Sequence, residues 1–125
     1  MNKEKIILLD RDGVINEDIG YLSNPSSINI YLDAVSFIKF GVKKKYKIFI
    51  VTNQSGIGRG FYEEKDFKMV MKSINKILNS FGINNLDYFF CPHLPNQLCD
   101  CRKPKTGMVN DLFLNNKFLL KKSWM

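Results

Sequence analysis

Four potential metal ligands lie in one short stretch of the sequence, CPHLPNQLCDC. The chain has three cysteines and one histidine, and this stretch contains all of them: Cys91, His93, Cys99 and Cys101. Thiolate and imidazole groups in this number can complete a tetrahedral zinc site, and a closed set of four protein ligands is typical of structural zinc. An odd cysteine count also argues against a disulfide framework. Three free thiols and an isolated histidine are the alternative.

Two carboxylates, Asp10 and Asp12, follow the apolar run Ile6 to Leu9 in the stretch DRDGVIN. At this spacing on a turn, both can face one site. One carboxylate can attack phosphorus to give an aspartyl phosphate, while the second protonates the departing oxygen. Magnesium would gather the phosphate oxygens and reduce the repulsion of the nucleophile by its substrate. A surface turn is the competing interpretation, and a calcium loop lacks its further acidic ligands.

Two other polar stretches could bind a phosphoryl group. Thr52 to Gly56 (TNQSG) offers a hydroxyl, amides and a close backbone approach. Lys103 could neutralise charge on the transferred group, and Arg102 could hold a second anionic group with its planar guanidinium. Taken singly, the first stretch is equally typical of a helix cap or a turn, and the second of two solvated cations.

Hydrophobic periodicity places these groups at the ends of strands. Residues 6–9, 48–51 and 86–90 are continuous apolar runs, typical of strands buried on both faces. Their alternation with helices predicts an α/β fold, a doubly wound (Rossmann-like) parallel sheet with helices on both faces. Ligands bind beyond the carboxyl ends of such strands, so Asp10, Thr52 and Cys91 should meet at one edge.

Three helices are expected between and after these strands. The first covers residues 34–45, is capped by Asp33, and turns Val35, Ile38 and Val42 inward. The second is strongly amphipathic and stops at Gly82; its apolar positions are Phe67, Val70, Met71, Ile74, Ile77, Leu78 and Phe81. Residues 54–60 should form a loop, 107–118 a third helix, and 123–125 the start of a further strand.

The length, composition and charge of the chain argue against a membrane-spanning or nucleic-acid-binding protein. A chain of 125 residues suits a single domain, residues 1–125, and no apolar run is long enough to span a bilayer. The formal charge of +7 comes from scattered lysines, so nucleic-acid binding is not expected. No signal-peptide pattern is present, which favours the cytoplasm.

The stretches DRDG, TNQSG and CRKP, in this order at three strand ends, resemble the haloacid dehalogenase superfamily of aspartate-nucleophile phosphatases. CPH followed by CDCRKP resembles its branch of histidinol phosphatases and heptose bisphosphate phosphatases. The likeness runs over essentially all 125 residues. It implies a capless phosphatase domain, because residues 13–32 leave room only for a loop or small flap.

The resemblance also implies roles for individual residues. Asp10 would be the nucleophile and a magnesium ligand, and Asp12 the general acid and base and a ligand through its backbone carbonyl. Thr52 and Lys103 would stabilise the phosphoryl group. The residues expected to bind substrate are Asp18, Ile19, Gly20, Tyr21, Asn53, Gln54, Ser55 and Arg102. The zinc would hold the loop that carries Arg102 and Lys103 over the site.

Two substrates remain open within this branch. The short CPHLPNQLCDC loop resembles histidinol phosphatases, whereas DRDGVIN, TNQSGIGRG and KTGM resemble the heptose enzymes. Because three segments expected to line the pocket resemble the heptose enzymes and only the length of one loop does not, the heptose substrate is favoured. The expected reaction removes the C7 phosphate from D-glycero-D-manno-heptose 1,7-bisphosphate, in nucleotide-heptose synthesis for lipopolysaccharide or surface glycans. Histidinol phosphate and a non-catalytic zinc protein are the alternatives.

One element of the family pattern has no counterpart in this sequence. The fourth motif, an acidic Gly-Asp turn after the next strand, would supply the remaining magnesium carboxylate, but the sequence reaches KKSWM first. We therefore expect weak magnesium binding, little or no activity of this chain, and an exposed first strand that could pair with another chain. The full-length protein is expected to be a monomer.

Overall fold

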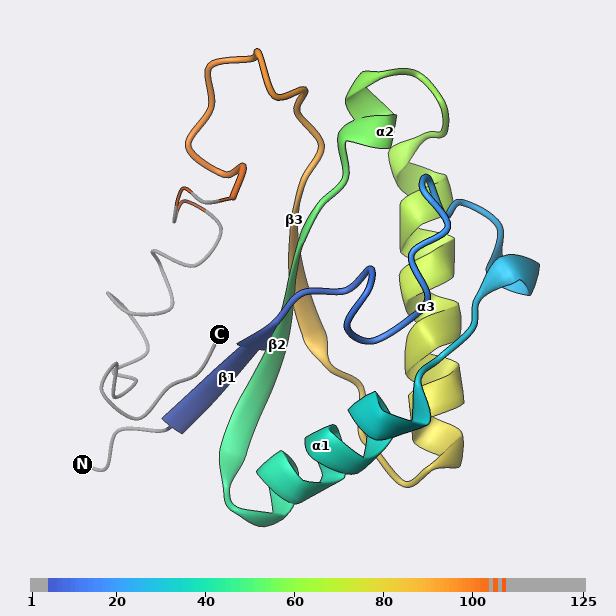
Figure 1. Cartoon of the computed structure of the whole chain (residues 1–125), viewed down its shortest axis with the longest axis vertical. Helices are drawn as coiled ribbons and strands as arrows, with labels where there is room; N and C mark the ends of the chain where they lie inside the picture. Colours follow the sequence, from blue (N-terminus) through green and yellow to red (C-terminus); the bar gives the residue numbers. More distant parts are fainter. Residues whose placement is uncertain (1–4, 104, 106, 108–125) are drawn as a thin grey trace.

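The computed structural model describes residues 5–103, 105 and 107. Three parallel strands form one sheet in the order β1 (Lys5–Leu9), β2 (Tyr46–Asn53) and β3 (Asp87–Cys91). Figure 1 shows them side by side, with β2 in the middle. The three predicted strands are confirmed: the apolar runs of β1 and β2 are buried in the parallel sheet, and that of β3 is partly buried.

The strand register brings the predicted functional ends to one edge. Leu9 pairs with Ile50, and Asn53 pairs with Cys91. The residues that follow β1 and β3 therefore lie beside the end of β2. This is the edge at which the parallel topology predicts ligand binding.

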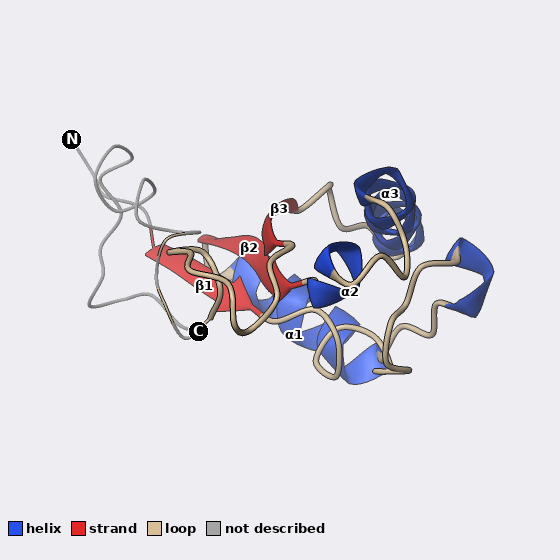
Figure 2. Ribbon diagram, turned by 90° about the horizontal axis from the view of Figure 1, so that it is seen from above, coloured by secondary structure: helices blue, strands red, loops and turns tan. Residues whose placement is uncertain are grey.

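Two long helices pack against the same face of the sheet (Figure 2). Helix α1 (Leu32–Lys43) contributes Val35 and Ile38 to the core, and α3 (Glu64–Ser80) contributes an apolar stripe from Phe67 to Leu78. The other face carries a second buried cluster, formed by Ile6, Leu8, Phe49 and Val51. The third expected helix, residues 107–118, and the strand at 123–125 lie outside the described residues, apart from Gly107 in a turn.

Two details of α1 differ from the prediction. Tyr31 occupies the N-cap position. Asp33 lies inside the first turn, where its negative charge stabilises the helix by interacting with the unpaired backbone N–H groups. Val42 is half exposed, and Gly41 is buried instead, against Ile48 and Ile7. Because glycine has no Cβ, the helix can approach the sheet closely at this position. A Cβ added to Gly41 would lie 3.1 Å from both isoleucine side chains, which is a tight contact.

The segment between β2 and α3 also differs in part. Residues 55–58 form a short helix, α2 (Ser55–Gly58), where a loop was predicted. Helix α3 then begins with a capping box between Glu63 and Asp66 and ends before Gly82, which has a positive φ of 85°. The predicted glycine stop is confirmed.

Between β1 and α1 the chain forms a loop with one short 3-10 turn, Pro25–Ser27. Ile15 and Leu22 anchor this loop in the core. Within residues 5–103, no helix is long and apolar enough to cross a membrane.

Candidate active site

A polar cavity of about 520 Å³ opens at the carboxyl edge of the sheet. Residues from the stretches around Asp10, Thr52 and Lys103, from the start of the β1–α1 loop and from the segment before α3 line it: Asp10, Asp12, Asp18, Gly20, Tyr21, Thr52, Asn53, Gln54, Ser55, Gly56, Tyr62 and Lys103. The strand register accounts for this convergence. Leu9 pairs with Ile50, so Asp10, which follows Leu9, lies near Thr52, two residues after Ile50.

Lys103 is docked on the end of β2. Its ammonium lies 2.7 Å from Asp10 Oδ1 and donates to the carbonyl of Val51 at 3.0 Å. Its backbone N–H donates to Asn53 Oδ1 at 2.9 Å, and the Asn53 amide donates back to the Lys103 carbonyl at 3.4 Å. Asp10 itself is half exposed, so the cation stands beside an accessible carboxylate.

Asp12 accepts hydrogen bonds from three different side chains. Arg11 Nε and Nη2 donate to its two oxygens at 3.0 Å each, and Asn16 Nδ2 donates to Oδ1 at 3.0 Å. Gln54 Nε2 donates to Oδ2 at 3.2 Å and to Thr52 Oγ1 at 2.7 Å. The carboxylate at the end of β1 and the hydroxyl at the end of β2 therefore share one donor.

Tyr62 supports this arrangement from the short connection between α2 and α3. Its hydroxyl donates to Gln54 Oε1, which orients the amide so that Nε2 faces Asp12. Burial raises the pKa of Tyr62 above its usual value, and the nearby Arg11 charge opposes that shift. Gly56 leaves the space that the Tyr62 ring needs, since a Cβ there would lie 2.2 Å from it.

Most of the predicted site residues meet in this cavity, and two do not. Ile19 is half exposed and does not line the cavity. Arg102 is turned away, with Nη1 donating to the backbone carbonyl of His93 at 3.4 Å. This contact arises because the loop carrying Arg102 folds back on the Cys91–Cys101 segment.

Sequence reasoning missed Tyr62, Gly56 and the buried contacts of Arg11. No residue pattern marks Tyr62, since it lies beside exposed Phe61 in a short connection. Gly56 belongs to the predicted TNQSG stretch, but its role depends on a ring that comes from outside that stretch.

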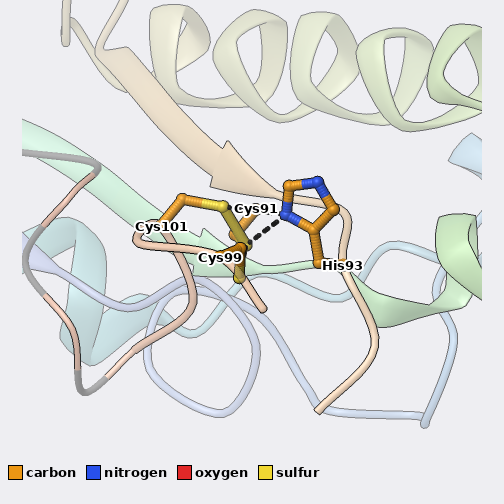
Figure 3. A group of neighbouring side chains, drawn as sticks. All are labelled: Cys91, His93, Cys99 and Cys101. Atoms are coloured by element: carbon orange, nitrogen blue, oxygen red, sulfur yellow. Dashed lines mark hydrogen bonds between the residues drawn. A yellow bond between two sulfur atoms is a disulfide. The ribbon is translucent and has the colours of Figure 1, made fainter. Parts of the chain in front are cut away.

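The four predicted zinc ligands form a single cluster (Figure 3). One ligand atom from each of Cys91, His93, Cys99 and Cys101 lies within 4.8 Å of the others. The structure also joins Cys91 to Cys101 by a disulfide and leaves Cys99 free, which the odd cysteine count did not predict. His93 Nδ1 lies 3.1 Å from Cys101 Sγ and 3.4 Å from Cys91 Sγ.

Both donor sets fit a metal. The sulfur and imidazole atoms of the cluster suit zinc, provided that Cys91 and Cys101 are reduced, since thiolates are the ligands. The cavity carboxylates Asp10 and Asp12 are hard oxygen donors of the kind that magnesium prefers. A metal-bound form would therefore exclude the Cys91–Cys101 disulfide, because both need the same sulfur atoms.

The cluster contacts the cavity through the backbone. Gln54 N–H donates to the Cys91 carbonyl at 2.7 Å, and Gly58 N–H donates to the Pro92 carbonyl at 3.0 Å. The end of β3 and the loop after it are thereby fixed to the start of α2.

Comparison with known proteins gives consistent similarities. Residues 15–123 match the family model described as polynucleotide kinase 3 phosphatase. A Thermoplasma volcanium protein named probable D-glycero-D-manno-heptose-1,7-bisphosphate 7-phosphatase is 42% identical over 113 residues, which cover 90% of this chain and 77% of the relative. A Helicobacter pylori D-glycero-beta-D-manno-heptose-1,7-bisphosphate 7-phosphatase is 36% identical over 126 residues, which cover all of this chain and 73% of the relative.

A solved structure is also similar. The D,D-heptose 1,7-bisphosphate phosphatase of B. bronchiseptica, crystallised with magnesium and phosphate, superposes with a TM-score of 0.77 at 31% identity. The match covers 86% of this chain and 61% of that chain.

Proposed function

The chain belongs to the haloacid dehalogenase-type phosphatases, in the family of heptose bisphosphate phosphatases, and on this premise we propose that it hydrolyses the C7 phosphate of D-glycero-D-manno-heptose 1,7-bisphosphate. The observation that carries the proposal is the convergence of Asp10, Asp12, Thr52 and Lys103 on one cavity, in a chain similar to relatives with this name. The reaction would serve nucleotide-heptose synthesis for lipopolysaccharide or surface glycans, in the cytoplasm.

In the proposed mechanism an Asp10 oxygen attacks phosphorus and forms an aspartyl phosphate. Asp12 gives a proton to the departing sugar oxygen, then takes one from the water that hydrolyses the intermediate. Lys103, 2.7 Å from Asp10, reduces repulsion between this carboxylate and the phosphate. Thr52 donates its hydroxyl hydrogen to a phosphoryl oxygen.

Magnesium would be held by the Asp10 carboxylate and the Asp12 backbone carbonyl, and when bound it supplies charge neutralisation at the phosphate. The magnesium in the B. bronchiseptica structure supports magnesium as the cofactor. Zinc in the reduced cluster would be structural, because its four protein ligands leave no coordination position for substrate.

Asp18, Gly20, Tyr21, Asn53 and Ser55 would contact the sugar and its phosphates from the cavity wall. For Ile19 and Arg102 the same role needs a rearrangement, since neither lines the cavity in this structure. Arg102 would first give up its bond to the His93 carbonyl.

Phosphate release at high magnesium concentration tests the proposal, because weak magnesium binding and slow turnover are expected of this chain. Three substrates would be compared at equal concentration: the heptose bisphosphate, histidinol phosphate and an oligonucleotide with a 3′-phosphate. We expect preference for the heptose bisphosphate and no turnover by Asp10→Asn. Preference for histidinol phosphate would assign the chain to the other enzyme of the branch. Preference for the oligonucleotide would support the activity for which the matching family model is named. Either result would overturn the proposal.

A further inference from the structure

The guanidinium of Arg11 is a buried charge that the mechanism above does not use. Arg11 is 0% exposed and is among the largest fully buried side chains in the described part of the chain. It lies between the end of β1 and helix α3, with Cζ 5.5 Å from the centre of the Phe67 ring and Nη1 3.8 Å from Met71 Sδ. Burying a charge in such surroundings requires a partner of opposite charge.

That partner is Asp12. Two nitrogens of the guanidinium bind the two carboxylate oxygens, Nε to Oδ1 and Nη2 to Oδ2, each at 3.0 Å, and Nη2 is also 2.9 Å from Oδ1. No other ion pair of Arg11 is present among the described residues. A planar guanidinium that grips both oxygens fixes the rotation of the carboxylate, which a single point charge does not.

Arg11 binds the Asp12 carboxylate from outside the cavity. Asp12 lines the cavity, whereas Arg11 does not and has no surface exposed to it. Asn16 and Gln54 complete the set of donors on the carboxylate. Any influence of Arg11 on the reaction therefore passes through the orientation of Asp12.

We propose that Arg11 is a positioning residue for proton transfer, and that its guanidinium aims the Asp12 carboxyl at the oxygen of the leaving group. The inference rests on the proposed function, in which Asp12 donates this proton. A proton donor contributes about 10²- to 10⁴-fold when correctly placed, and misplacement forfeits part of that factor.

The leaving group provides the test. For a sugar phosphate, whose alkoxide needs a proton to depart, Arg11→Met should lower kcat by about 10- to 100-fold while KM changes by less than about threefold. For p-nitrophenyl phosphate, whose leaving group departs as a stable anion, the same variant should lose less than about threefold in kcat. Arg11→Lys keeps the charge without the paired grip and should fall between Arg11→Met and the unaltered protein.

Met71→Leu is the matched control, because Met71 contacts the opposite end of the guanidinium and not Asp12. It should leave both rates unchanged. If Arg11→Met lowers kcat equally for the two substrates, the role of Arg11 is purely structural and the inference is overturned. If Arg11→Met does not fold, the same comparison is made with Arg11→Lys.

A spectroscopic measurement adds a readout independent of turnover. The ¹⁵N–¹H signal of Arg11 Nε should exchange slowly with water in the unaltered protein and should shift in Asp12→Asn. An unchanged signal would overturn the inference. Absence of turnover on both substrates would overturn the proposed function and this inference together, whereas turnover with equal losses overturns the inference alone.

Discussion

The ammonium of Lys103 lies 2.7 Å from Asp10 Oδ1 and 3.0 Å from the carbonyl oxygen of Val51. One cation thus connects the loop after β3, the middle of the sheet and the carboxylate that follows β1. Because the Asn53 side chain also pairs with both the backbone N–H and the carbonyl of Lys103, the position of this charge is set by β2.

Lys103→Met should reduce kcat/KM by about 10²- to 10³-fold, the usual loss when one group that stabilises transition-state charge is removed. Steady-state phosphate release measures the effect. Lys68→Met is the control, since Lys68 pairs with Glu64 on the exposed side of α3. A loss below about fivefold would show that the ammonium of Lys103 is not needed for phosphoryl transfer.

Zinc content should distinguish the two states of the cysteine cluster. The reduced protein should bind one equivalent of zinc, and Cys99→Ser should weaken binding by at least about tenfold, because one of four ligands is lost. The oxidised variant should still contain the Cys91–Cys101 disulfide, since Cys99 takes no part in it. Chelator competition and thiol titration measure these quantities. Equal zinc affinity in the variant and the unaltered protein would exclude the four-ligand site.

The stability of the protein should fall in alkaline solution because of Tyr62. Burial raises the pKa of this phenol in the folded state above its value of 10.0 in the unfolded chain. The neutral phenol therefore contributes stability that is complete below pH 10 and is lost as the pH rises through the folded-state pKa. Urea unfolding between about pH 8 and 11 should show a shallower decline for Tyr62→Phe. Tyr31→Phe, at a partly exposed position, should behave like the unaltered protein.

Gly56→Ala should destabilise the fold by about 1–3 kcal/mol, because the new methyl group would overlap the Tyr62 ring. In a Tyr62→Ala background the same change should cost less, since the overlapping ring is absent. Thermal or urea unfolding of the four proteins gives the coupling. Additive losses would mean that the space beside Gly56 is not set by Tyr62.

The sequence was sufficient to predict those features that depend on residue type and local order. Continuous apolar runs identified all three strands, and the parallel topology then brought Asp10, Thr52 and Cys91 to one edge. The Cys/His cluster was predictable because these residue types occur nowhere else in the chain.

Features that depend on tertiary contacts were not predictable. Arg11 reads as a solvated cation in DRDG, and only the packing of Phe67 and Met71 over it reveals a buried guanidinium. Tyr62 joins the site through Gln54, a contact across a turn and a short helix that no periodicity encodes. Arg102 was placed in the pocket by analogy, but the fold of its loop directs it to the His93 carbonyl.

The tip of β2 holds consecutive residues that each serve a different part of the molecule. Thr52 and Gln54 contact each other and Gln54 contacts Asp12, while Asn53 holds Lys103 and the Gln54 backbone holds Cys91. Inserting or deleting one residue here would shift the register of all these residues and break their contacts together. The loop before α1 has no such succession of cavity contacts after Tyr21, so a change in chain length between residues 23 and 27 would disturb the cavity less. A protein engineer wishing to graft a new substrate-binding segment should therefore lengthen that loop and leave the strand tip intact.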